Sequence, residues 1–374
     1  MLILGDICPT KDNIELFKNG DAKALFGDVL PLIDNADVAL ANLECALADN
    51  PKPIQKAGPV LHAPTATAAT LKKAGIGVLS LANNHIRDCG DEGVKSTLKA
   101  CSESGIKTVG AGENIIAAKQ PLMLGLDGKK VAVVSFAEHE FNFATKERAG
   151  AATLDIYEDF DRLRSLRQQV DVLIVFYHGG IEYHPYPSPL LAKKCRKMAD
   201  CGADLVLCQH SHCIGTVEHR GDSTIVYGQG NSVFGYRDGD DGWNRGMIVE
   251  LDLSGEKPSS QCHFIEAALN GGIQLMTETK AESWRQTLQE RERNVASDEF
   301  IEEQWQQFCV RIAPLDLPLL LGWRRLPIAL NRRLGNSLVK LLYSRRRANV
   351  THNLIRCEAH HEVVSTILRQ NDYN

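Results

Sequence analysis

Six apolar stretches of this sequence each close on a polar side chain of a kind that binds metal ions. The stretches are MLILGD, ADVALANLE, IGVLSLANNH, VDVLIVFYH, ADLVLCQHSH and STIVYGQGN, which close on Asp6, Glu44, Asn84 with His85, His178, His210 with His212, and Asn231. A mixed set of carboxylate, amide and imidazole ligands suits Mn, Zn or Fe, and two such ions can share one carboxylate. The sequence therefore predicts a site for one or two divalent metal ions.

Short runs rich in Val, Ile and Leu are typical of buried strands, and helical patterns separate them here. The clearest helices are predicted over 65–75, 93–105 and 189–202, each ending at a glycine. Strands that alternate with helices from residue 1 to about 270 predict a layered α/β domain. In such domains the carboxyl ends of the strands form the crevice where ligands bind, so we expect the polar residues to share one cleft.

Each of these residues also has an ordinary structural explanation when it is taken alone. Asp6 could cap a helix, Glu44 could be paired with a cation, and Asn84 could belong to a turn. His210 and His212 are separated by one residue, so on an extended loop their side chains would point the same way. The occurrence of all of them at the ends of separate apolar runs favours a common site.

The composition is that of an ordinary soluble protein. The chain has 374 residues, of which 44% are hydrophobic and 24% charged, and its net charge of −5 argues against a nucleic-acid partner. Its 11 cysteines form no CxxC pairs, which favours reduced thiols. No signal peptide or membrane-spanning run is visible, so we expect a cytoplasmic protein with at most peripheral membrane contact.

The character of the chain changes near Gly271 and Gly272. We predict an α/β domain over 1–272 and a helical region over 273–374 that is basic from about residue 311. Between Arg311 and Arg356 only Asp316 is acidic, and Leu, Ile and Trp323 lie among the arginines. Three roles remain open for this basic segment: contact with an anionic membrane, binding of an anionic polymer, and packing against the α/β domain.

Six motifs together resemble those of the CapA family of capsule and poly-gamma-glutamate synthesis proteins, which belongs to the calcineurin-like metallophosphoesterase superfamily. They are GDICP, NLECAL, LANNHIRDCG, FYHGGIEYHPYP, ADLVLCQHSHCIGTVE and VYGQGNSVFG, in order over roughly residues 1 to 250. The resemblance implies a four-layer α/β/β/α sandwich with metals at the strand ends. It also implies a metal-dependent hydrolase that acts on a phosphoester or related bond, linked to capsule or poly-gamma-glutamate production.

The resemblance also implies roles for individual residues. Asp6 and His212 would hold a first ion, and Asn84, His178 and His210 a second, with Glu44 bridging the two and His85 as the acid. Cys8 stands where related phosphoesterases usually have a histidine, which makes it a candidate extra ligand. Glu182, His184 and Asn231 would line the substrate pocket, and Asp88 would orient His85 or cap the next helix.

Bound ions of this kind lower the pKa of water from 15.7 to about 7, and a general acid adds typically 10²–10⁴-fold. The same chemistry could cleave an amide in a glutamyl polymer, because activated water also attacks carbonyl carbon. A further alternative is a non-catalytic assembly factor that binds polymer or membrane. The expected partners are therefore a phosphoester or anionic polymer, with no nucleic acid.

Overall fold

The computed structural model of the chain describes residues 1–320, 325–335, 337–342 and 345–370. They form two compact units, Met1–Trp305 and Gln306–Asn374, which are treated separately below. Trp323 and Arg324 of the predicted basic segment lie outside the described residues.

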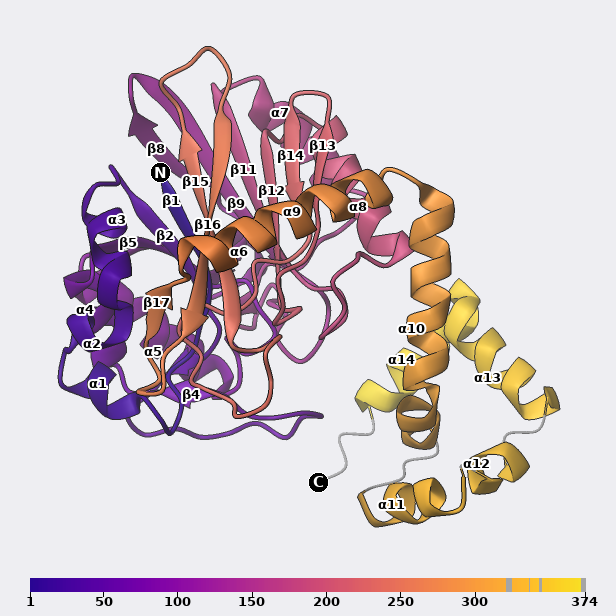
Figure 1. The fold of residues 1–374 in the computed structure, drawn as a ribbon. Coiled ribbons are helices and arrows are strands. Elements are labelled where there is room, and N and C mark those ends of the chain that lie inside the picture. The colour runs from indigo at the N-terminus through magenta and orange to yellow at the C-terminus, as the bar shows by residue number, and fades with distance from the viewer. Residues whose placement is uncertain (321–324, 336, 343–344, 371–374) are drawn as a thin grey trace. The chain divides into compact units, whose positions relative to one another are not determined.

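Two large sheets form the centre of the first unit (Figure 1). The first sheet has the order β17 (Ile273–Leu275), β16 (Ser259–Ala267), β15 (Arg245–Asp252), β1 (Leu2–Ile7), β2 (Ala39–Leu43), β5 (Ile76–Ser80) and β6 (Lys107–Val109). The second has the order β13 (Val217–Arg220), β14 (Ser223–Val226), β12 (Leu205–Gln209), β11 (Val172–His178), β9 (Lys129–Ala137) and β8 (Leu122–Leu126). Each sheet contains four adjacent strands that are parallel to one another. They are β1, β2, β5 and β6 in the first sheet and β9, β11, β12 and β14 in the second.

Helices cover the outer face of each sheet. The first sheet carries α1 (Ile14–Lys18), α2 (Ala22–Phe26), α3 (Leu30–Asp34), α4 (Ala66–Lys73) and α5 (Gly90–Glu103). The second carries α6 (Ile115–Ala118), α7 (Asp159–Arg167) and α8 (Pro189–Asp200). Two short ladders, β3 (Ala46–Leu47) with β4 (His62–Ala63) and β7 (Ala111–Gly112) with β10 (Gly150–Ala151), complete the connections.

The alternation of side chains along the strands produces three hydrophobic cores. In β11, Leu173 and Val175 pack toward the outer helices, whereas Ile174 and Phe176 pack between the two sheets. In β1, Leu2 and Leu4 face the helices and Ile3 faces the other sheet. Because both faces of these strands are buried, they are apolar up to the polar residues near their carboxyl ends, Asp6 in β1 and His178 in β11. The predicted four-layer α/β/β/α sandwich is confirmed.

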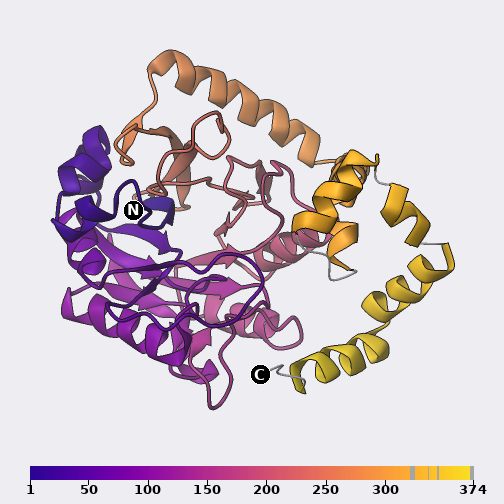
Figure 2. The same cartoon turned by 90° about the horizontal axis from the view of Figure 1, so that it is seen from below.

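Helix α9 (Glu278–Val295) belongs to this first unit. It contacts β13 in one sheet and β16 in the other, and its Ala281 and Leu288 are part of the core between the sheets. Figure 2 shows α9, in orange, along one side of the two sheets. The division between the compact units therefore falls at Trp305, later than the expected 272, because the apolar side of α9 covers the edge of the inter-sheet core.

The second unit is helical, as the sequence predicts for this region. Helix α10 (Asp298–Leu319) leads into it, followed by α11 (Arg325–Arg333), α12 (Ser337–Leu342), α13 (Arg345–Arg356) and α14 (Glu358–Gln370). Helices α11 and α12 contact each other, as do α13 and α14. Among the described residues, no helix combines the length and the apolar character needed to cross a bilayer.

Truncation of Leu288 to alanine should lower the free energy of unfolding of the first unit by about 2–3 kcal/mol, because it leaves a cavity at the edge of the core between the sheets. Glu290 is exposed on the same helix, and Glu290→Ala should change the stability by less than about 0.5 kcal/mol. Urea unfolding followed by circular dichroism measures both. Equal stability of the two variants would mean that α9 is not part of this core.

Candidate metal centre

The predicted metal-binding residues lie where strands of both sheets end. In the first sheet Asp6 is the penultimate residue of β1, Glu44 directly follows β2, and Asn84 lies in the segment after β5. In the second sheet His178 is the last residue of β11, and His210 directly follows β12. Parallel strands place their carboxyl ends on one edge of a sheet, so the two sheets present these side chains to a shared space.

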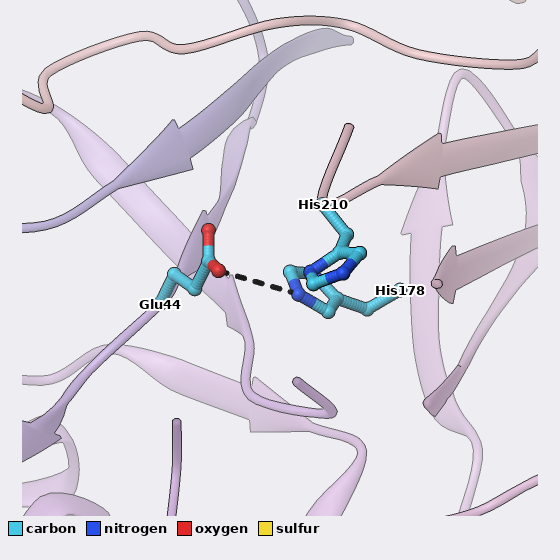
Figure 3. Close-up of side chains that lie close together, drawn as sticks. All are labelled: Glu44, His178 and His210. Atoms are coloured by element: carbon cyan, nitrogen blue, oxygen red, sulfur yellow. Dashed lines mark ion pairs between the residues drawn. The ribbon is translucent and has the colours of Figure 1, made fainter. Parts of the chain in front are cut away.

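The possible ligand atoms form two groups that share Glu44. One group contains Glu44, His178 and His210, and the other contains Asp6, Glu44 and His212. Within each group the ligand atoms all lie within 4.8 Å of one another. Figure 3 shows the first group, in which Glu44 Oε1 lies 3.4 Å from His178 Nε2. Glu44 is thus placed to serve both groups.

The first group has spacings that suit a bound ion. Asn84 joins it, with Oδ1 at 3.0 Å from His178 Nε2. Two atoms that each lie about 2.1 Å from one ion are about 3.0 Å apart at a right angle and about 3.4 Å apart at a tetrahedral angle. The second group is more open, because His212 Nε2 lies 3.9 Å from Glu44 Oε1.

Glu44 is the buried group that most needs a cation. Its side chain is 0% exposed, and neither carboxylate oxygen has a hydrogen-bond partner among the described residues. A buried carboxylate without compensation costs several kcal/mol. The two histidines beside it offer neutral nitrogen ligands but no fixed positive charge. The residues present therefore fit a divalent metal ion.

Burial shifts the pKa values at this site in the directions that favour neutral forms. Burial raises the pKa of Glu44 to about 8, and burial together with the charge of Glu44 raises the pKa of Asp6 to about 7. Burial lowers the pKa of His178 to about 4 and the pKa values of His210 and His212 to about 3. Neutral imidazole is the form that binds metal, whereas the carboxyl groups must lose protons to do so.

Buried amides orient the groups around the centre. Asn42 Nδ2 donates to Asp6 Oδ1 at 2.8 Å and lies 3.3 Å from His178 Nδ1. His212 Nδ1 lies 2.9 Å from Asn231 Oδ1, and Asn231 Nδ2 donates to the carbonyl oxygen of Trp243 at 3.0 Å. With Nδ1–H donated to Asn231, His212 turns Nε2 toward Glu44. Sequence reasoning missed Asn42, although it is the penultimate residue of β2 just as Asp6 is of β1, and it missed Trp243, which lies in a loop.

The loop after β12 departs from the extended form expected for the two histidines. His210 has φ 98° and His212 has φ 51°, both in the left-handed region. The amide of His210 donates to Asp6 Oδ2 at 3.1 Å, which ties this turn to the first sheet. The two rings consequently enter different groups around Glu44. Backbone strain of this kind persists where the surrounding structure imposes it, and it is common at functional sites.

His85 lies beside the two groups, held by a buried ion pair. Its Nε2 is 3.9 Å from Glu44 Oε1, and its Nδ1 is 2.6 Å from Asp88 Oδ2. Lys56 Nζ donates to Asp88 Oδ1 at 2.7 Å and to the carbonyl oxygen of Asn84 at 3.2 Å. The side chains of Lys56 and Asp88 are each 1% exposed. Nothing in the sequence marked Lys56, because it lies in the loop between β3 and β4, far from any strand end.

The other four expected residues have different surroundings. Cys8 belongs to neither group of ligand atoms; it is buried in the core between the first sheet and its helices, and contact with Cys45 and burial raise its pKa. His184 packs with Tyr186 and Trp305, at ring distances of 6.2 and 6.3 Å. Asn231 contacts His212 through its side-chain oxygen, so its amide orients that imidazole. Glu182 is half-buried, and its charge helps to raise the pKa of Glu44.

A four-layer sandwich with such a cluster between its sheets is the arrangement expected of calcineurin-like metallophosphoesterases. The family described as "Bacterial capsule synthesis protein PGA_cap" matches residues 1–236, and the chain belongs to this family.

Curated relatives carry consistent descriptions. "Capsule biosynthesis protein CapA" of Bacillus anthracis is 32% identical over 254 residues, which cover 66% of this chain and 61% of that protein. "PGA biosynthesis protein CapA" of Bacillus subtilis (strain 168) is 28% identical over 251 residues, covering 65% and 63%. The chain thus spans about three-fifths of the length of these relatives.

Among solved structures, a hypothetical protein from Thermus thermophilus aligns with a TM-score of 0.44 and 15% identity, covering 71% of this chain and 98% of that one. At that level of similarity it supports no conclusion about this chain.

Uptake of Mn²⁺ by the metal-free protein should release protons at pH 7 and almost none at pH 9. The raised pKa values of Asp6 and Glu44, about 7 and 8, mean that both carboxyl groups hold protons near neutrality, and these must leave when the ion binds. The apparent affinity should therefore rise with pH between about 6 and 8.5. Calorimetry in two buffers of different ionisation enthalpy counts the protons, and equal release at pH 7 and 9 would contradict the assignment.

Proposed function

We propose that this protein is a metal-dependent hydrolase that cleaves a phosphoester or related bond in the production of a capsule or poly-gamma-glutamate. One observation carries the proposal: Glu44 is fully buried with no hydrogen-bond partner among the described residues, and it is shared by two groups of possible ligands, one with two imidazoles and one with an imidazole and a carboxylate. Such a carboxylate is costly unless a cation accompanies it. Membership of the capsule synthesis family supports the biological setting.

Divalent ions held by these residues would supply an activated water near neutral pH and would polarise the oxygen of the bond to be cleaved. Asn84, His178, His210 and Glu44 would hold one ion, and Asp6, His212 and Glu44 the other. The closer spacing of the first group makes it the tighter of the two sites. Asn42 and Asn231 keep the ligands in place through their amide contacts.

His85 is the residue that would transfer a proton. Its shortest contact, 2.6 Å from Nδ1 to Asp88, requires the Nδ1 hydrogen to point at that carboxylate. Nε2 is then the ring atom that faces the centre. With both ring nitrogens protonated, His85 would donate the Nε2 proton to the oxygen of a leaving group and be left neutral with its hydrogen on Nδ1. Lys56 balances the charge of Asp88, so the carboxylate orients His85 without needing a proton of its own.

The bond type is the finer part of the proposal. Activated water attacks phosphorus and carbonyl carbon alike, so amide cleavage in a glutamyl polymer is the second candidate within the same mechanism. A screen of phosphomonoesters, phosphodiesters and poly-gamma-glutamate with the Mn²⁺-loaded protein separates the two. Release of phosphate or alcohol without release of glutamate supports the phosphoester assignment.

Replacement of His85 by alanine should leave metal stoichiometry nearly unchanged and lower turnover by about 10²–10⁴-fold, because His85 moves a proton rather than holding an ion. Glu44→Ala should instead lose metal, since this carboxylate serves both groups, and Glu44→Gln should do the same while preserving side-chain volume. Metal content by atomic emission and turnover on the best substrate measure the two effects.

His219→Ala is the matched control for the first variant, because His219 is exposed on β13. It should change neither metal content nor turnover. Loss of metal in His85→Ala to the same extent as in Glu44→Ala would contradict the division of roles. Full metal content in all variants, with no activity on any substrate, would instead favour the assembly-factor alternative.

A further inference from the structure

The charge of the chain is divided between its two units. Residues 306–374 contain 11 Lys and Arg against 4 Asp and Glu, a net charge of +7, although the whole chain has −5. Most of these cations are arginines, and only Asp316 is acidic between Arg311 and Arg356. A segment with this excess attracts an anionic partner over a distance set by the ionic strength.

The second unit also exposes an unusual amount of apolar surface. Among its described residues 13 large hydrophobic side chains are exposed, against 8 in the much larger first unit. The most exposed include Val310 at 76%, Leu368 at 62%, Val350 at 56% and Ile355 at 55%. Scattered apolar residues are ordinary on a surface, but a concentration on a few helices marks an interaction surface.

Helix α13 shows how charge and apolar surface are combined. It has no buried residue. At about 100° per residue, Val350, Leu354 and Ile355 spread over about 140° of the helix surface, and Arg347 lies among them. Arg345 and Arg356 fall on the opposite side, and Arg346 lies at the edge next to Val350. In α11, Leu330 is likewise exposed, and the exposed Leu334 follows just past the end of the helix. Arg333 lies about 60° around the helix from Leu330, whereas Arg332 lies on the opposite side. An apolar face bordered by arginines is the pattern of a helix that lies in a membrane interface.

We propose that the helices of residues 306–374 bind the surface of an anionic lipid bilayer, with their apolar faces in the acyl boundary and their arginines at the headgroups. A soluble polyanion would neutralise the arginines but would leave the exposed Val, Leu and Ile in water. A bilayer accepts both, because its headgroups carry charge and its interior takes apolar side chains. The contact is peripheral, and it does not depend on the proposed hydrolase activity.

Co-sedimentation of the full chain with vesicles tests the proposal. We expect binding to vesicles of phosphatidylcholine in which about 3 in 10 lipids are the anionic phosphatidylglycerol, and little binding to vesicles of phosphatidylcholine alone. On an anionic surface each basic residue contributes roughly 1 kcal/mol to binding. Arg345→Gln with Arg346→Gln should weaken binding by about 10- to 30-fold. Val350→Asn with Leu354→Asn should weaken it by at least about tenfold, because apolar burial is lost. Raising NaCl from about 0.1 to 0.5 M should reduce the binding of the native chain.

The matched control is Lys95→Gln with Lys99→Gln, which removes two exposed cations from α5 in the first unit and should bind like the native chain. Unchanged far-UV circular dichroism shows that each variant is folded. No binding of the native chain to anionic vesicles overturns the proposal. The proposal is also overturned if the variant with Val350→Asn and Leu354→Asn binds anionic vesicles as well as the native chain and the native chain binds soluble polyglutamate. That pair of results indicates a site for a polyanion. If the native chain self-associates without lipid and the variant with Val350→Asn and Leu354→Asn does not, the apolar faces dock copies of the chain to one another, and the proposal is overturned.

Discussion

The burial of two carboxyl groups between two sheets is the constraint on which the rest of this site depends. Asp6 and Glu44 are both 0% exposed, and three neutral histidines surround them. Such an arrangement is unfavourable as a dianion in a protein interior, and the raised pKa values of both groups express that cost. A small, highly charged cation at the same place would stabilise both carboxylates at once.

The surrounding polar network is organised around that constraint. Asn42 links a candidate ligand of the first sheet, Asp6, to a candidate ligand of the second, His178. The segment after β14 then passes beside β1, where the amide of Ser232 donates to the carbonyl oxygen of Asp6 at 2.8 Å and brings Asn231 to His212. These contacts join the two sheets at their carboxyl ends, so the geometry of the centre is set by the packing of the whole sandwich.

The loops add a second, distinct device beside the metal groups. A buried Lys56, Asp88 and His85 form a chain of contacts whose last member faces Glu44. An ion pair at 1% exposure contributes little net stability, because desolvation offsets the attraction. Its value is orientation: it fixes the position of the imidazole and keeps Nε2 directed at Glu44.

The sequence by itself determined the layered α/β fold and the strand-end positions of Asp6, Glu44, Asn84 and the histidines, because buried strands are continuous apolar runs whose ends are visible in one dimension. Their roles as ligands came from family resemblance and stay a prediction. Only the tertiary structure decided that Cys8 faces a core, that Lys56 and Asn42 reach the site, that Asn231 orients His212, and that α9 joins the first unit. These depend on loop paths, positive φ angles and contacts between residues far apart in the chain, which local periodicity does not encode.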